Sequence, residues 1–283
     1  MMDSTFVSGT DCHCGMGKES LRVQWLRNCA RLTIGTVAAA WIAGTCALQA
    51  QPITIPNFSF ESPATTFVDP RIDHWQKTPQ PGWYDPVTFG GYTWDQTMGL
   101  FMNVPPGDAR HIPNCDGAQA IYLFAIPGVG LFQDYNSTDW RGGSPSHAFD
   151  AVFQPGLSYK LTVGVMPGNG LLEGASLRLG LYYLDDAQMP QPVAATDILY
   201  TAAAFPGTPW LTDFEVNVPT VLASDAWAGR HLGIEIVSTS MGGTFWDVDN
   251  VRLTVVPEPG VFSLLALGGA TLLSRRCRWL GGC

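Results

Sequence analysis

The central part of this 283-residue sequence predicts an all-β fold, an antiparallel β-sandwich. Its apolar residues recur at every second position in several short runs, as expected of strands with one buried face. Gly, Pro, Asn and Asp separate these runs, and no long run has the 3.6-residue period of an amphipathic helix. Many short strands joined by turns, without helices between them, are typical of a sandwich.

Six segments carry the strand pattern clearly. The alternation is cleanest around Glu235, which lies between Ile234 and Ile236. The expected strands span residues 118–124, 158–165, 176–184, 212–218, 231–237 and 245–255. Residues 67–116 are rich in Trp, Tyr, Pro, Gly and Asp, so we expect long loops there, where binding surfaces are often built.

The N-terminal residues have the layout of a secretory signal peptide. Three arginines precede an apolar stretch, and small residues follow it: Arg22, Arg27 and Arg31 come before residues 32–48. We therefore expect residues 1–50 to be an N-terminal extension and signal helix, with Ala47 and Ala50 as candidate cleavage positions; cleavage after Ala50 would start the mature chain at Gln51. Lipid attachment at Cys46 is an alternative, although Ala43-Gly44-Thr45 is a poor lipobox.

The C-terminal residues 256–283 combine a stiff motif, a short apolar run and a basic cluster. The motif is Pro257-Glu258-Pro259, the run spans residues 261–273, and the cluster holds Arg275, Arg276 and Arg278. Apolar residues favour the bilayer core, and arginines at the end of such a run favour the cytoplasmic side. The run is short for a full span, so we expect a short transmembrane helix that anchors weakly.

This C-terminal order resembles the PEP-CTERM sorting signal of Gram-negative bacteria. The resemblance implies a processing protease of the exosortase type as partner, transient anchoring in the inner membrane, and a final place at the cell surface or outside the cell. An ordinary C-terminal tail anchor is the alternative.

The segment between these ends is acidic and nearly free of cysteine. From residue 51 to 256 there are 8 Lys and Arg against 20 Asp and Glu. Such a surface repels nucleic acid, which we exclude as a partner. Of the seven cysteines, Cys115 alone falls in this segment, so an internal disulfide is excluded there and the fold depends on its core.

The order of several fragments within residues 51–255 resembles galactose-binding-like jelly-roll domains, which include many carbohydrate-binding modules. The fragments are residues 56–61, Gly82-Trp83, and residues 130–133, 154–161 and 245–253. The resemblance implies a jelly-roll sandwich whose first and last strands pair. It also implies that Glu61 and Asp249 hold one structural calcium ion, a cation that takes 6–8 oxygen ligands. Glu61 as a cap for backbone N–H groups is the alternative.

The candidate ligand site consists of aromatic residues in the loop-rich region, with Gln133 as a polar partner. Sugar rings stack on flat aromatic faces while their hydroxyl groups need polar partners. The candidates are Trp83, Tyr84, Tyr92, Trp94 and Gln133. The alternative is that Trp83 and one of the other residues pack in the core or under loops.

Catalysis is not expected from the sequence. Asp185-Asp186 and Asp247-Asp249 are paired acids, but such pairs arise by chance among so many carboxylates, and no Gly-x-Ser-x-Gly elbow or zinc-binding His spacing occurs. Asp247 and Asp249 share one face of a strand, which fits ion binding or capping as well as acid–base chemistry. The two resemblances imply a non-catalytic surface or matrix protein that binds exopolysaccharide. The alternatives are a structural matrix or adhesion protein and a glycoside hydrolase.

Overall fold

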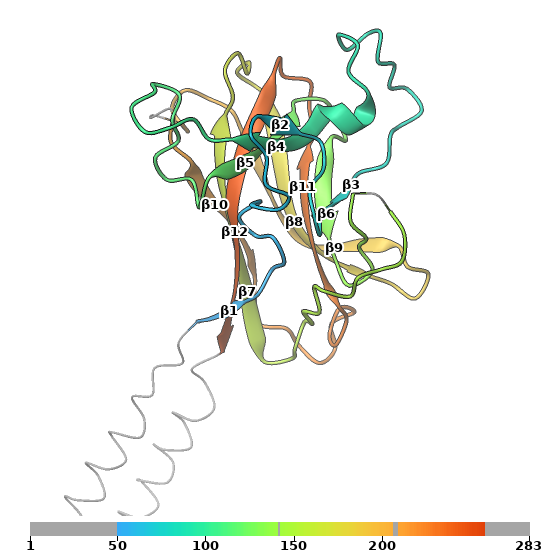
Figure 1. Cartoon of the computed structure of the whole chain (residues 1–283). Coiled ribbons are helices and arrows are strands. Elements are labelled where there is room, and N and C mark those ends of the chain that lie inside the picture. The colour runs from blue at the N-terminus through green and yellow to red at the C-terminus, as the bar shows by residue number, and fades with distance from the viewer. Residues whose placement is uncertain (1–49, 141, 206–208, 258–283) are drawn as a thin grey trace, which may run out of the picture. The chain divides into compact units, whose positions relative to one another are not determined.

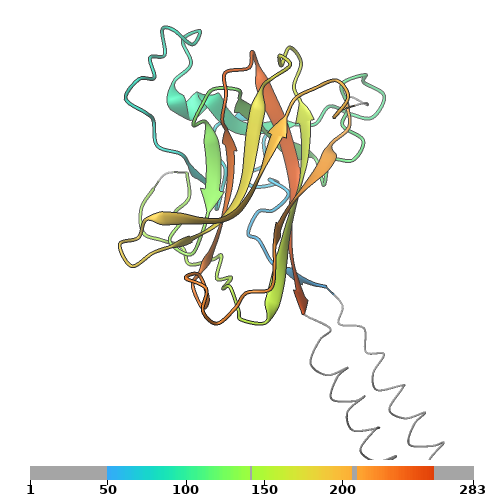
Figure 2. The same cartoon turned by 180° about the vertical axis from the view of Figure 1, so that it is seen from behind.

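A computed structural model describes residues 50–140, 142–205 and 209–257. These residues form two antiparallel sheets packed face to face, seen from opposite sides in Figures 1 and 2. The all-β sandwich expected from the sequence is therefore confirmed.

The first sheet has seven strands, and β12 lies at its centre. The order is β10-β7-β12-β5-β4-β2, with β1 also paired to β12. The strands are β1 (Gln51–Ile53), β2 (Val68–Asp69), β4 (Met98–Met102), β5 (Gln119–Phe124), β7 (Leu157–Pro167), β10 (Thr212–Val218) and β12 (Phe245–Pro257).

The second sheet has five strands in the order β3-β6-β11-β8-β9. They are β3 (Gln76–Lys77), β6 (Gly130–Gln133), β8 (Ser176–Leu184), β9 (Pro190–Leu199) and β11 (Leu232–Ser238). One short 3-10 helix, η1 (Trp94–Thr97), leads directly into β4. The loop that precedes η1 extends away from the sandwich (Figure 1, teal).

The strand β12 is long and is buried on both faces over its first half. Residues 245–248 pair with β5, residues 253–255 pair with β1, and β7 flanks the opposite side. Trp246 and Val248 point into the core between the sheets and are fully buried. Because side chains alternate along a strand, Asp247 and Asp249 lie on the other, outer face of the seven-stranded sheet.

All six expected strands occur, with bounds that differ by at most two residues at either end. The sequence pattern missed β1, β2, β3, β4, β6 and β9. The expectation of loops over residues 67–116 is partly wrong, because β4 crosses this region with Met98 and Leu100 in the core. The strand β9 shows little apolar alternation, because it begins at Pro190 and Ile198 is its one fully buried residue.

The expected signal and sorting segments lie outside the described residues. Within residues 50–257, apart from the short gaps named above, no helix has the length and apolarity needed to span a membrane. The signal peptide, the PEP-CTERM motif and the short transmembrane helix therefore stay predictions.

The buried amide of Gln119 joins the N-terminal loop to β5. Its Nε2 donates to the carbonyl oxygens of Phe60 (2.9 Å) and Pro63 (3.1 Å), and its Oε1 accepts a hydrogen bond from the Thr65 N–H. One side chain thus satisfies three backbone groups of a loop that has no strand partner of its own at these positions.

We predict that Gln119→Ala lowers the free energy of unfolding by about 2–4 kcal/mol, because it leaves buried backbone groups without partners. Guanidinium unfolding of the purified protein measures this change. Gln154→Ala, at an exposed glutamine, is the matched control and is expected to change little. An equal, small effect of both substitutions would contradict the role assigned to Gln119.

Candidate functional site

The five residues expected to form a sugar platform do not lie together on an exposed surface. Trp83 and Tyr92 are 54% and 47% exposed, whereas Tyr84, Trp94 and Gln133 are buried. The ring of Tyr84 packs edge-on against Trp94 and its hydroxyl donates to the Tyr92 carbonyl (2.8 Å). Tyr84 and Trp94 therefore fix the loop before η1, whereas Trp83, which the alternative placed in the core or under a loop, is exposed.

The indole N–H of Trp94 and the amide nitrogen of Gln133 are also committed within the fold, whereas the buried Oε1 of Gln133 has no hydrogen-bond partner. The indole N–H of Trp94 donates to the carbonyl oxygen of Thr78 (2.7 Å). Gln133 Nε2 donates to the carbonyl oxygens of Pro56 (3.1 Å) and His74 (2.8 Å). These contacts hold the N-terminal loop against the five-stranded sheet, which is a structural role.

Glu61 and Asp249 meet at one loop, as the pairing of the first and last strands implied. Glu61 Oε1 accepts hydrogen bonds from the backbone N–H groups of Ala118 (2.9 Å) and Gln119 (2.8 Å). Asp249 Oδ2 accepts one from the N–H of Asp116 (2.6 Å). Hydrogen bonds to the Glu61 and Asp249 carboxylates thus hold the same loop.

The two carboxylates at this loop leave one oxygen atom that could bind a cation. The buried Oδ1 of Asp249 has no hydrogen-bond partner, which leaves one oxygen for a cation. Among the described residues there is no group of three or more His, Cys, Asp or Glu side chains that could hold a metal ion, and the predicted site uses two carboxylates with backbone carbonyls. The calcium ion stays a prediction, and nothing below depends on it.

Asp247 is the most unusual ionisable group of the sandwich. It lies at the centre of the seven-stranded sheet, opposite Tyr122 of β5 and opposite Met166 of β7. Its side chain is buried, and its Oδ1 has no hydrogen-bond partner. A buried carboxylate without such partners is costly, so the group takes up a proton instead. Burial accordingly raises the pKa of Asp247 to about 8.

Aromatic rings border Asp247 on the same outer face. Tyr122 and Phe124 alternate along β5, and Phe245 lies opposite Phe124 on β12. The ring centroids of Phe124 lie 5.9 Å from Tyr122, 6.4 Å from Phe245 and 5.1 Å from Tyr92. All four rings are partly exposed, so this aromatic row offers an accessible apolar surface next to the buried acid.

Two loops cover the other side of Asp247. The loop between β4 and β5 and the residues before β10 are joined by Asn114, whose amide both donates to the Leu211 carbonyl (2.8 Å) and accepts from the Leu211 N–H (3.0 Å). Beneath them a small apolar cluster forms outside the main core: Ile112, Met166 and Leu211 with Phe101 and Cys115. This cover keeps water from the sheet around the acid.

The other polar groups on this face are not suited to nucleophilic attack. Burial, with the nearby Asp249 carboxylate, raises the pKa of the Cys115 thiol well above its usual range, so a thiolate is disfavoured. Burial also raises the pKa of Tyr122 to about 12, and its hydroxyl donates to the Gln96 carbonyl (3.2 Å). The arrangement as a whole is a neutral carboxylic acid beside an aromatic surface.

The sequence analysis weighed Asp247 but did not select it. The available signal was an acid at the centre of a strand whose neighbours on both sides, Trp246 and Val248, belong to the core. That alternation is equally typical of a half-exposed strand. The cover that buries Asp247 comes from segments about 40 to 140 residues away in sequence, which no local pattern reveals.

Comparison with known proteins assigns the sandwich to a family. The model of the HpiC1-like family, described as HpiC1 cyclase, matches residues 51–254. No protein among the curated sequences matches the chain.

Solved structures with a similar fold include cyclases. The Stig cyclase Fisc from Fischerella sp. TAU, in complex with (3Z)-3-(1-methyl-2-pyrrolidinylidene)-3H-indole, is 22% identical, with a TM-score of 0.50 over 74% of this chain and 99% of that chain. A cyclase from the same organism bound to 4-(1H-indol-3-yl)butan-2-one is 23% identical, with a TM-score of 0.51 over 74% and 98%. These likenesses show a shared fold.

A carbohydrate-binding module is similar at a much lower level. TmCBM61 in complex with β-1,4-galactotriose is 10% identical, with a TM-score of 0.32 over 57% of this chain and 83% of that chain. A likeness this weak supports no inference about sugar binding.

The prediction of a non-catalytic protein is wrong, because the family whose model matches is one of cyclases. The sequence argument looked for two carboxylates across a cleft or for a nucleophile with a base. It passed over a single buried acid, the feature that stands out on the outer face of the sheet. The match spans the sandwich from β1 into β12, and the chain belongs to the HpiC1-like cyclase family.

Proposed function

We propose that this protein is an acid-dependent cyclase whose active site is the outer face of the seven-stranded sheet, with Asp247 as the proton donor. The observation that carries the proposal is the position of Asp247, a buried carboxyl with a free oxygen beside partly exposed aromatic rings. A general acid needs a carboxyl that keeps its proton near neutral pH, which burial among apolar groups provides.

The proposed reaction is an isomerisation that needs no oxidant or reductant. Asp247 gives its proton to an unsaturated carbon of the substrate, whose π electrons form the new C–H bond. The cationic centre is then attacked by a second π system of the same molecule, and a new C–C bond closes the ring. Loss of a proton from the product restores the neutral carboxyl of Asp247.

The aromatic row fits such a substrate. Residues directly opposite each other on paired strands have Cβ atoms about 4.5–5.5 Å apart, so a ligand stacked on Tyr122 reaches the carboxyl of Asp247. The faces of aromatic rings attract positive charge, which supports a cationic intermediate in a site with little water. We therefore propose an apolar, unsaturated aromatic substrate. The indole compounds bound to the two Fischerella cyclases supply the first probes.

We further propose that the chain is exported and sorted before it acts. Support comes from the tripartite N-terminal segment and from the order of Pro257-Glu258-Pro259, the apolar run and the arginines. An exosortase-type protease at the inner membrane is the proposed processing partner, and the cell surface or the extracellular space is the proposed final location.

Replacing Asp247 by Asn is expected to abolish cyclisation while the fold persists. The amide keeps the shape of the side chain but has no acidic proton, and general acids contribute about 10²–10⁴-fold to rate. Alkenyl-indole compounds are incubated with the protein and analysed by liquid chromatography–mass spectrometry for products of unchanged mass. Asp213→Asn, at an exposed acid of the same sheet, is the matched control. Equal turnover by the Asp247 and Asp213 variants would refute the assignment.

The titration of Asp247 predicts a pH dependence of both activity and stability. Because its folded pKa is raised from 3.8 to about 8, its contribution to stability is complete below pH 3.8 and is lost as pH rises through about 8. Activity is expected to fall over the same upper range. At pH 9 the Asp247→Asn protein is expected to melt higher than wild type, by about 2–4 °C for each kcal/mol relieved.

Differential scanning calorimetry between pH 5 and 9, in buffers with EDTA, measures this difference. Burial also raises the pKa of Asp249 to about 7, but Asp249 is present in both proteins and its contribution cancels in the comparison. Parallel melting curves for the two proteins across this range would show that Asp247 is ionised in the fold.

The sorting proposal predicts the ends of the mature protein. Protein recovered from the surface or medium of its native host is expected to begin near Gln51 and to lack the apolar run after Pro259. Intact-mass spectrometry measures both ends. Recovery of a chain that retains Arg275, Arg276 and Arg278 throughout would contradict processing.

A further inference from the structure

We propose that the outer face of the five-stranded sheet carries a second ligand site, at Glu235, which binds a small organic ammonium ion. Glu235 lies on β11, the central strand of this sheet, opposite Phe132 of β6 and Gly180 of β8. Its two neighbours in sequence point the other way and are fully buried in the core. The site is therefore on the opposite side of the sandwich from Asp247, and it does not depend on the cyclase assignment.

The Glu235 side chain lies flat against the sheet because Gly180 has no side chain. A Cβ atom at Gly180 would come within 2.6 Å of Cγ and Oε1 of Glu235. The ring of Tyr182 lies over Gly233 in the same way, 2.3 Å from where a Cβ atom would be. The Glu235 carboxyl is therefore held near the backbone of β8 and is not extended into water. This burial raises its pKa, because the charged form loses hydration.

Among the described residues, no positive group is paired with the Glu235 carboxylate. Arg178, two residues from Gly180 on β8, is the cation whose charge acts on it. Its guanidinium, however, is bound to both carboxylate oxygens of Asp197 on β9, at 2.8 and 3.1 Å. A partly buried carboxylate whose nearby cation is already neutralised gains from a counter-ion supplied by a ligand.

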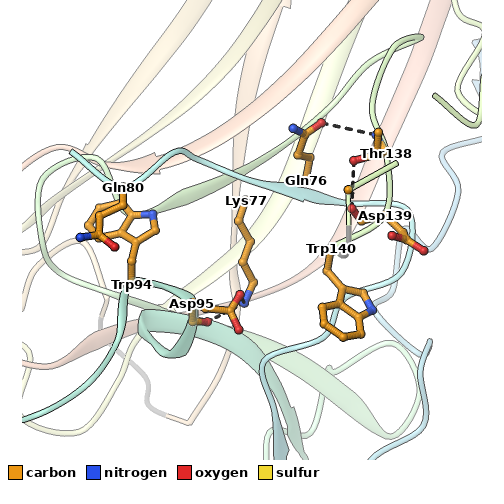
Figure 3. Close-up of a pocket in the computed structure, with 9 residues that line it drawn as sticks. Gln76, Lys77, Gln80, Trp94, Asp95, Thr138, Asp139 and Trp140 are labelled. Carbon is orange, nitrogen blue, oxygen red and sulfur yellow. Dashed lines mark hydrogen bonds and ion pairs between the residues drawn. The ribbon is translucent and has the colours of Figure 1, made fainter. Parts of the chain in front are cut away.

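Lys77 at the edge of the sheet does not compensate Glu235 either. On β3, Gln76 lies opposite Phe132, and Lys77 is the next residue. Figure 3 shows Gln76 and Lys77 leaving β3 in opposite directions, with Lys77 beside Asp95. The Lys77 ammonium forms an ion pair with the Asp95 carboxylate at 2.7 Å. Both cations near this face are thus paired with other acids.

A second acid on the same face is satisfied by hydrogen bonds. Asp134 follows Phe132 by two residues and accepts hydrogen bonds from the Tyr182 hydroxyl (2.6 Å) and the Asn136 N–H (2.8 Å). Burial and the charge of Arg178 are the influences on Glu235, without a hydrogen bond among them. The difference leaves Glu235 as the acid of this face that a ligand can serve.

The charges of this face favour a cation over an anion. Asp134, Asp197 and Glu235 outnumber the single base, Arg178, so an anionic ligand is repelled. Metal cations such as calcium need more oxygen ligands than one free carboxylate supplies. An organic ammonium ion has no such requirement, because its charge needs one acid and its hydrocarbon part needs apolar contact.

Phe132 and Ala195 provide that apolar contact. Residues directly opposite each other on paired strands have Cβ atoms about 4.5–5.5 Å apart, so a cation at Glu235 is within reach of the Phe132 ring. This ring is partly exposed, and the face of an aromatic ring attracts positive charge. On the other side, Ala195 lies opposite Gly180 on β9 and is small and exposed, which leaves the approach to the carboxyl open.

The test compares a cation with its uncharged analogue. Choline and 3,3-dimethylbutan-1-ol have the same shape, but choline alone is charged. Binding of each to the full chain is followed by saturation-transfer NMR and isothermal titration calorimetry. We expect a millimolar dissociation constant for choline and an affinity for the alcohol that is at least about tenfold lower, or about 1.4 kcal/mol. Equal affinity for the two compounds would overturn the proposal.

Two substitutions at the site and one matched control locate the binding. Glu235→Gln keeps the shape of the side chain but removes its charge, so we expect choline affinity to fall at least about tenfold. Phe132→Leu keeps an apolar side chain without a ring and is expected to weaken binding about two- to fivefold. Glu215→Gln, at an exposed acid of the other sheet that is paired with Lys160, is expected to leave the affinity unchanged.

Two further measurements keep the outcome clear. Glu235→Gln removes a partly buried charge and is expected to melt no lower than wild type, so lost binding is separated from lost fold. Asp247→Asn is expected to bind choline as wild type does, and a failed cyclase assay therefore leaves this proposal intact. Equal choline affinity of wild type and Glu235→Gln, or an affinity that falls with Asp247→Asn instead, would each refute the site.

Discussion

The burial of β12 on both faces is the constraint on which the rest of the structure depends. A strand at the centre of a sandwich sheet normally has one face in the core and one face in water. Here the inner face supplies Trp246 and Val248 to the core, while loops cover the outer face at Asp247 and Asp249. A strand fixed on both sides by packing cannot slip in register without moving buried groups.

The two acids of this strand, Asp247 and Asp249, differ in their hydrogen bonds and therefore in what sets their pKa values. Asp249 accepts a hydrogen bond from the Asp116 N–H and so holds the loop that closes the outer face. The Oδ1 atoms of both acids have no hydrogen-bond partner, but for Asp247 burial acts without opposing hydrogen bonds and raises the pKa to about 8, because ionisation would leave a bare charge in an apolar setting. One acid therefore builds the cover, and the cover raises the pKa of the other.

The regular pairing of β12 with β7 is interrupted directly after Asp249. The register between β12 and β7 shifts between Asp249 and Arg252, and Asn250 has a left-handed backbone with φ of 59°. Within this irregular stretch the Val251 N–H donates to the Phe58 carbonyl (3.0 Å) instead of to a strand. Bulges of this kind are frequent beside active sites, where they end regular pairing and re-aim side chains.

The regular strands of this fold can be predicted from the sequence. Residues 176–184 and 212–218 alternate cleanly and are strands with those bounds. The first strand, Gln51–Ile53, is too short for a period to emerge, and β6 combines Gly130 with buried residues on both faces. Tyr84 and Trp94 were expected to face a ligand but are buried, and the reason is related. Composition shows that a loop is rich in aromatics, but which rings pack inward depends on contacts distant in sequence.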